Sequence, residues 1–140
     1  MKIIMGIGNE LNGDDAIGVL IVRKLKRKLK DWEIIDAGTM PENYTSKIER
    51  LNPELLVMID AIEDKELPPG DVKIVEPSHI GKLALSTHSI PLSVLYGYLS
   101  QFIPKIIIIG IGIKEHIPYT SCTLPLDRVM DKVINILGEL

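Results

Sequence analysis

Residues 2–15 read KIIMGIGNELNGDD, in which a short apolar run leads into a glycine-containing loop and then into two adjacent acids. The apolar run predicts a strand over Ile3–Gly8, and apolar residues spaced three or four apart over Ile17–Leu29 predict a helix after the loop. We expect Asp14 and Asp15 to cap this helix and to place acids in its first turn. In open α/β sheets, ligands bind beyond the carboxyl ends of the strands, so this strand-to-helix corner is the expected place for a site.

Strand and helix patterns alternate along nearly the whole chain. Most of the expected strands are continuous apolar runs, which are typical of strands covered on both faces. Such alternation predicts a single-domain α/β fold, a three-layer α/β/α sandwich with a mainly parallel sheet of about five strands and right-handed crossovers. The further strands are expected at Glu33–Asp36, Leu55–Asp60, Val72–Val75 and Ile106–Ile111, and the further helices at Asn43–Leu51, Pro91–Phe102 and Leu126–Leu137.

Val72–Val75 is the expected exception to parallel pairing. Only the short, turn-rich link Leu67–Asp71 separates it from the preceding strand, so an antiparallel position at an edge of the sheet is favoured. We find no internal repeat, low-complexity segment or interdomain linker. Residues 1–140 are therefore expected to form one domain.

Composition and charge argue against several classes of protein. The chain has 140 residues, of which 46% are hydrophobic, and this is enough to bury the core of one domain. Its formal net charge of -3 lacks the basic excess that nucleic-acid phosphates require. The densest basic stretch, Arg23–Lys30, is typical of the solvated face of a helix. We therefore expect no nucleic-acid partner.

Cysteine content and the length of the apolar runs bear on the compartment. Cys122 is the only cysteine, which rules out a disulfide within the chain and an all-cysteine metal site. The N-terminus shows no cationic leader, and no apolar run approaches the roughly 20 residues of a membrane span. We expect a cytoplasmic monomer without membrane insertion.

Two later segments offer groups that could join the corner. Asp60 follows a continuous apolar run, where a carboxylate is costly to bury without a partner, although it could instead be a cap or turn residue. His88 lies in a polar segment before a helix that begins with proline, and such loops often carry functional groups. Because one acid suffices for capping, Asp14 or Asp15 is free to face the cleft. Two carboxylates and an imidazole would suit a divalent ion such as nickel or zinc.

Other chemistries find less support in the sequence. No Gly-x-Ser-x-Gly elbow occurs, and Cys122 has no evident base beside it, so it is interpreted as packing material. Gly6–Asn9 lacks the third glycine of a dinucleotide fingerprint and is not followed by a lysine-bearing phosphate loop. Its glycines are interpreted as shaping the corner and letting the helix pack closely. His79 and His116 lack a comparable context and are expected to be surface or turn residues.

The motifs taken together resemble those of the [NiFe]-hydrogenase maturation endopeptidases, and most of all the branch that processes the large subunit of formate-hydrogenlyase-type enzymes. The resemblance covers nearly the full length, and the ordered combination is specific where each motif alone is not. The matching segments are GIGN (6–9), GDDAIG (13–18), IDAGT (35–39), PEN (41–43), IDA (59–61), PG (69–70), THSIPL (87–92) and IGI (109–111).

The resemblance implies an aspartic-type endopeptidase that removes a C-terminal extension from the hydrogenase large-subunit precursor after nickel insertion. In this family, an acid in the first loop, an aspartate at a central strand and a histidine before a later helix contact the metal. These positions correspond to Asp15, Asp60 and His88, with Asp14 as a rival for the first. The nickel would be carried by the substrate, and Asp15 or Asp60 would act as a general base on water.

The same resemblance assigns a role in substrate binding to Asp36, Gly38 and Thr39, which match an Asp-x-Gly-Thr segment. Two other functions remain open at this stage. The same metal-contacting residues could serve a non-catalytic nickel checkpoint or metallochaperone for hydrogenase assembly. The Gly6–Asn9 turn could bind an anion in a small-molecule α/β enzyme.

Overall fold

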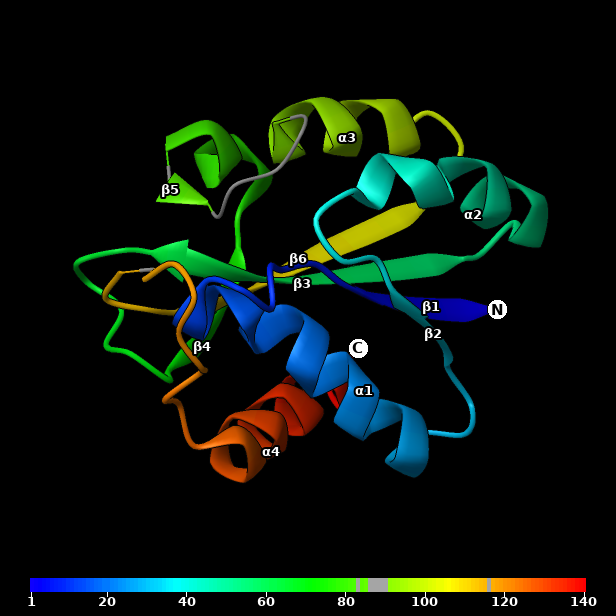
Figure 1. Ribbon diagram of the computed structural model, residues 1–140. Coiled ribbons are helices and arrows are strands. Elements are labelled where there is room, and N and C mark those ends of the chain that lie inside the picture. The colour runs from blue at the N-terminus through cyan, green and yellow to red at the C-terminus, as the bar shows by residue number, and fades with distance from the viewer. Residues whose placement is uncertain (83, 86–90, 116) are drawn as a thin grey trace.

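The middle layer of the fold is one sheet with the strand order β2-β1-β3-β6-β4, and β5 pairs with β3 off this path (Figure 1). The computed structural model describes residues 1–82, 84–85, 91–115 and 117–140. β1, β2, β3 and β6 run parallel, whereas β4 and β5 are antiparallel to their partners. The strands are β1 (Lys2–Gly6), β2 (Glu33–Asp36), β3 (Leu55–Glu63), β4 (Val72–Val75), β5 (Ala84–Leu85) and β6 (Lys105–Gly112).

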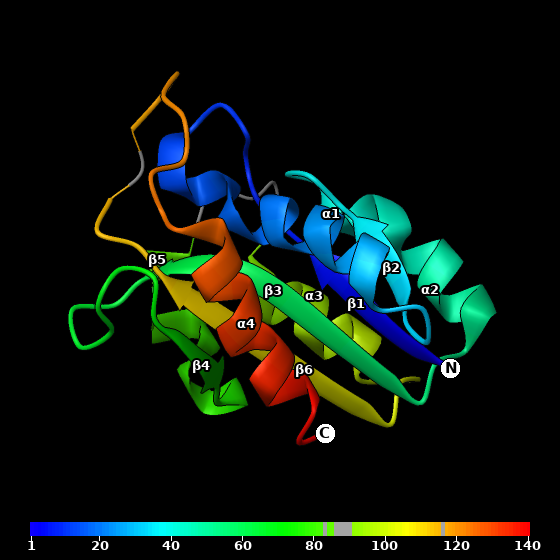
Figure 2. The same ribbon diagram turned by 90° about the horizontal axis from the view of Figure 1, so that it is seen from below.

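Helices cover both faces of the sheet, as the alternating pattern predicts. α1 and α4 lie on one face and α2 and α3 on the other, a division that is visible in two perpendicular views (Figures 1 and 2). The predicted three-layer α/β/α architecture is therefore confirmed. The α-helices are α1 (Ile17–Lys28), α2 (Thr45–Leu51), α3 (Leu92–Leu99) and α4 (Leu126–Leu137), and the 3-10 turns are η1 (Gly13–Ala16), η2 (Pro41–Tyr44) and η3 (Pro77–Lys82).

β4 occupies an edge of the sheet and is antiparallel, as its short connection predicts, but its partner is β6 and not the preceding β3. Two backbone hydrogen bonds extend the pairing between β4 and β6 beyond the start of β4. The Gly70 N–H donates to Gly112 O at 2.9 Å, and the Gly112 N–H donates to Asp71 O at 2.8 Å. The turn-rich link therefore leads from β3 past the position of β6 and places β4 on the far side of β6.

Several element boundaries differ from those predicted. β1 ends at Gly6 and not at Gly8, because the chain turns there toward η1. β3 runs three residues past the predicted end at Asp60, since β6 and β5 continue to pair with it as far as Ile62 and Glu63. Each of the first two α-helices is preceded by a separate 3-10 turn, which the 3.6-residue periodicity does not distinguish from the helix.

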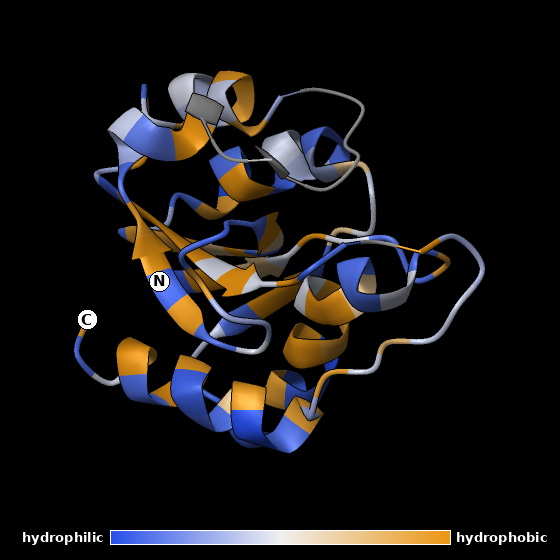
Figure 3. Ribbon diagram, turned by 90° about the vertical axis from the view of Figure 1, so that its left-hand side faces the viewer, coloured by the Kyte–Doolittle hydropathy of each residue, from blue (hydrophilic) through white to orange (hydrophobic). Residues whose placement is uncertain are grey.

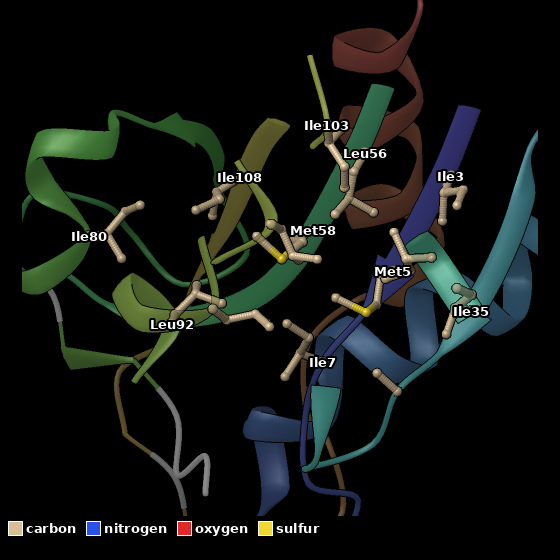
Figure 4. Close-up of a cluster of buried hydrophobic side chains, with 14 of the residues drawn as sticks. Ile3, Met5, Ile7, Ile35, Leu56, Met58, Ile80, Leu92, Ile103 and Ile108 are labelled. Carbon is tan, nitrogen blue, oxygen red and sulfur yellow. The ribbon is translucent and has the colours of Figure 1, made fainter. Parts of the chain in front are cut away.

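Alternation along the buried strands divides the core into two apolar clusters. One lies under α2 and α3 and includes Ile3, Met5 and Met58 (Figure 4). The other lies under α1 and α4 and includes Ile4 and Val57. Strands are largely hydrophobic, whereas the helices carry both hydrophilic and hydrophobic stripes (Figure 3). Within the described residues, no helix combines the length and apolar character needed to cross a bilayer.

Candidate active site

The order of the strands defines one crevice in the sheet. From β1 the chain passes through α1 to β2 on one side of β1, and then through α2 to β3 on the other side. The direction of the connections therefore reverses between β1 and β3. In open α/β sheets, ligands bind beyond the carboxyl ends of the strands at such a switch point. The segment after β1 and the distal part of β3 are the two walls of this crevice.

The start of α1 packs directly on the carbonyls at this point. A Cβ atom added to Gly18 would lie 2.6 Å from Ile59 O and closer still to Ile7 O, so only glycine fits there. A Cβ atom on Gly8 would lie 2.5 Å from Asp15 O. The Ile7 N–H donates to Ile59 O at 2.9 Å, which continues the β1–β3 contact beyond β1. A Cβ atom on Gly6 would lie 2.5 Å from Gly18 O of α1, so the interpretation that the glycines of Gly6–Asn9 let the helix pack closely is confirmed.

Asp15 and Asp60 are the only charged side chains that are fully buried in the described part of the chain, each with 0% exposure. Asp15 belongs to η1, which contacts β3. Asp60 lies within β3, one residue beyond Ile59, the partner of the last residue of β1. Its Oδ1 accepts a hydrogen bond of 2.8 Å from the Ala61 N–H. Burying carboxylates costs free energy, and such groups concentrate at functional sites.

Asp14, the neighbour of Asp15, has a different environment. Its carboxylate accepts hydrogen bonds from the Thr123 N–H at 2.6 Å and from Thr123 Oγ1 at 2.9 Å. It therefore holds the loop before α4 against η1. The prediction that these acids cap the helix is wrong, because the N-cap residues of η1 and α1 are Asn12 and Ala16, neither with a side-chain cap. Both acids do lie in the first turn of η1.

Asp36, predicted to bind substrate, lies at the end of β2 and is held by Arg23 of α1. Arg23 Nε donates to Asp36 Oδ2 at 2.8 Å, and the same guanidinium donates to both carboxylate oxygens of Glu10 at 2.9 and 2.5 Å. The hydrogen bond from Arg23 lowers the pKa of Glu10. The sequence pattern of the helix alone places Arg23 on a solvated face and does not indicate this pairing. The order of the elements along the chain does contain a signal for this pairing. Glu10 follows β1, Asp36 ends β2, and Arg23 lies on the helix that connects these two strands.

Gly38 and Thr39, also predicted to bind substrate, form the turn after β2 at the same end of the sheet. Gly38 has a positive φ of 57°, and its N–H donates to Asp36 Oδ1 at 3.2 Å. The Gly8 N–H donates to Gly38 O at 2.9 Å, which joins this turn to the loop after β1. Thr39 is half-buried. The turn therefore borders the crevice.

His88 lies outside the described residues, and so does His116. The motif that contains His88 includes Pro91, the N-cap residue of α3, and ends at Leu92, which belongs to the same apolar cluster as Ile7 (Figure 4). Among the described residues, no three histidine, cysteine or acidic side chains are grouped so as to hold a metal ion. The described part of the corner thus contains two buried carboxylates, those of Asp15 and Asp60.

Cys122 is half-buried and packs against the apolar cluster under α1 and α4. Burial raises the pKa of its thiol, and the nearby charge of Asp14 raises it further. A thiol of this kind is a poor nucleophile at neutral pH, because the thiolate is the reactive species. This agrees with the interpretation of Cys122 as packing material.

Fold and site together define an α/β protein with two buried acids at the switch point of a mainly parallel sheet. A family model described as hydrogenase maturation protease, HycI, matches residues 19–139. The chain therefore belongs to the hydrogenase maturation protease family, which confirms the family predicted from the motifs. Members of this family are peptidases of hydrogenase maturation.

Individual relatives agree with this assignment. The chain is similar to the hydrogenase 3 maturation protease of Escherichia coli K12, with 35% identity over 133 residues that cover 94% of this chain and 85% of the relative. It is similar in structure to the E. coli endopeptidase HycI, with a TM-score of 0.85, 29% identity and coverage of 99% and 90% of the two chains. The HycI protease of Thermococcus kodakarensis gives a TM-score of 0.81 at 31% identity, with the same coverage.

Proposed function

We propose that this protein is an endopeptidase that removes the C-terminal extension of a [NiFe]-hydrogenase large-subunit precursor, and that it acts only after nickel has been inserted. The observation that carries the proposal is the burial of Asp15 and Asp60 at the switch point, where ligands bind in α/β sheets. The described part of the core contains no other buried charged side chain, and the two acids belong to two elements that contact each other, η1 and β3. Such an arrangement is costly for folding and is expected where function requires it.

In this proposal the nickel is part of the substrate. Asp15, Asp60 and His88 contact it, and His88 enters on its sequence motif alone. A bound divalent ion polarises a carbonyl oxygen and lowers the pKa of water. Asp15 or Asp60 accepts the proton from the attacking water as general base, which corresponds to an aspartic-type peptidase. Asp15 is favoured over Asp14 as the first ligand, because the Asp14 carboxylate is already engaged by Thr123.

Asp36, Gly38 and Thr39 would recognise the substrate through the turn after β2. The Asp36 carboxylate is engaged by Arg23 and by the Gly38 N–H. Its contribution is therefore to fix the shape of the turn. Gly38 supplies the positive φ that the turn requires, and Thr39 presents its backbone and hydroxyl group to the peptide. Asp36→Asn should raise KM for the precursor more than it lowers kcat.

The deciding experiment incubates the purified protein with nickel-loaded and with nickel-free large-subunit precursor, and follows the intact mass of the precursor. Loss of a C-terminal peptide from the nickel-loaded form alone is the expected result. Asp15→Asn should abolish this loss, whereas Asp14→Asn, which keeps an acceptor for Thr123, should retain most of it. Nickel-dependent binding without a change in mass would instead mean that the same residues serve a non-catalytic checkpoint.

A further inference from the structure

Two loops that are distant in sequence are joined beside the proposed active site. Asn12 and Thr120 form a parallel bridge, the Gly13 N–H donates to Thr120 O at 3.0 Å, and the Tyr119 N–H donates to Leu11 O. Both views show the two loops side by side beyond the carboxyl ends of the strands (Figures 1 and 2). The pairing makes one continuous surface from the loop after β1 and the loop before α4.

This surface exposes three large apolar side chains, which we call the apolar rim. Leu11 is 61% exposed, Ile117 is 50% exposed and Tyr119 is 87% exposed. Tyr119 also has a positive φ of 60°, which is an outlier for a bulky residue. Its backbone bond to Leu11 holds it in this conformation, so the fold maintains a strained, exposed aromatic side chain. Strain of this kind clusters at functional sites.

The apolar rim lies next to the turn that carries Asp15. The Asp15 N–H donates to Asn12 O at 3.1 Å, so the loop that carries Leu11 also fixes the start of η1. A pocket of about 270 Å³ opens between the two loops, and its lining includes Ile117, Thr120 and Asp14. A protein substrate whose peptide enters the crevice beside η1 would therefore lie next to the rim.

We propose that the apolar rim is a docking surface for the folded body of the precursor, which would present a complementary apolar patch next to the scissile segment. The inference rests on the proposed function, because that function supplies a protein substrate. Three side chains alone cannot supply the roughly 800 Å² per partner of a stable interface, which argues against a second copy of this chain; a precursor would add the contacts of its scissile segment in the crevice. The three side chains are sufficient for a small cluster of anchor residues, in which tyrosine is common.

The test compares the wild type with Leu11→Ser and Tyr119→Asn, since asparagine tolerates a positive φ and preserves the local backbone. The matched control is Val94→Ser on α3, because Val94 is 58% exposed and lies outside the paired loops. The probe is nickel-loaded large-subunit precursor, with Kd from biolayer interferometry and kcat and KM from intact mass. Each rim variant should raise Kd and KM about tenfold with kcat unchanged, whereas Val94→Ser should match the wild type.

Rim variants that bind the precursor as tightly as the wild type would overturn the proposal. So would a concentration-dependent dimer in sedimentation velocity that the rim variants abolish, because the occupant would then be a second copy. If the wild type binds but does not cleave, the proposed function fails while the change in Kd still decides the role of the rim. If the wild type neither binds nor cleaves, both proposals are wrong.

Discussion

The two ends of the parallel strands differ in how deeply their charged side chains are buried. At the amino end, the Met1 ammonium lies 3.4 Å from Glu54 Oε1, and Lys2 Nζ lies 4.6 Å from the centre of the Trp32 ring. Both contacts are at the surface, where solvent screens the charges and the side chains can adjust. At the carboxyl end, Asp15 and Asp60 are fully buried. The charged contacts described at the amino end thus cost little, whereas the carboxyl end also buries two carboxylates, where charge costs most.

The difference shows which end of the sheet is shaped by requirements other than stability. Apolar side chains of similar volume at positions 15 and 60 would remove two buried charges from the core. A fold that retains acids there, and that brings helix α1 against the strand carbonyls through Gly18, gives up stability at one corner. We expect that corner to respond sharply to substitution in both activity and stability, and the amino end to respond weakly.

The largest expected effect comes from Asp60→Asn. Loss of a general base or of a ligand to the nickel should lower the rate of precursor processing by a factor of about 10² to 10⁴. The free energy of unfolding should change little, because asparagine matches aspartate in volume and keeps an oxygen that can accept the Ala61 N–H bond. Intact-mass kinetics and urea unfolding measure the two quantities. His88→Ala should show the same loss of processing in a folded protein, and wild-type rates in both variants would contradict the site.

Gly18→Ala should cause the largest loss of stability. The added Cβ atom would lie 2.6 Å from Ile59 O and closer to Ile7 O, and neither backbone group can move without disturbing β1 or β3. We expect a loss of about 3 kcal/mol in the free energy of unfolding, measured by urea titration, because overpacking at this site displaces backbone.

Gly97→Ala is the matched control for this substitution. Gly97 lies inside α3, and a Cβ atom there would meet nothing within 4 Å. Alanine is the better helix former by up to about 1 kcal/mol, so the control should be slightly more stable than the wild type. Equal effects of the two substitutions would mean that α1 is not tightly fixed at the crevice.

The architecture could be predicted from the sequence because the buried strands are unbroken apolar runs, and clear turn and helix signals separate them. The ends of β1 and β3 could not, since they depend on which neighbour stops pairing first. β3 continues past Asp60 only because β6 and β5 still pair with it. The length of β3 therefore depends on tertiary pairing with its neighbours. This pairing places Asp60 inside the strand and not after it.

The candidate site was predictable in position but not in detail. Strand ends and the switch point direct attention to Asp15 and Asp60, yet adjacent acids have the same propensities, so the sequence left Asp14 as a rival. Thr123, which engages Asp14, lies 109 residues away along the chain. The pairing of Arg23 with two acids was missed for the same reason, because each partner lies 13 residues away in a different element.

Arg23→Gln tests whether the ion pairs of Arg23 with Glu10 and Asp36 contribute to the free energy of unfolding. Arg23 lowers the pKa of Glu10, so their pairing stabilises the fold fully above the ordinary pKa of glutamate and is lost as the pH falls through the lowered value. Because both groups are half-exposed, we expect a loss below about 1 kcal/mol at pH 7. This loss should shrink as Glu10 becomes protonated, and 1 M salt should reduce it.

Arg27→Gln provides the comparison for that measurement. Arg27 lies one turn further along α1, is exposed, and forms no ion pair with the described residues. Urea unfolding of the wild type and both variants at pH 7 and in acid separates the loss of a specific pairing from the loss of one positive charge. An Arg27→Gln protein that loses as much stability as Arg23→Gln would indicate a general charge effect.

Glu54→Gln should have the smallest effect. Its carboxylate is 72% exposed and lies 3.4 Å from the Met1 ammonium, so solvent already screens most of their attraction. We expect a change within about 0.5 kcal/mol in the free energy of unfolding, because exposed ion pairs contribute little. Thermal and urea unfolding measure it. A loss of about 1 kcal/mol or more would show that stability also depends on the charges at the amino end. The two ends would then differ in the burial of their charges but not in their importance for stability.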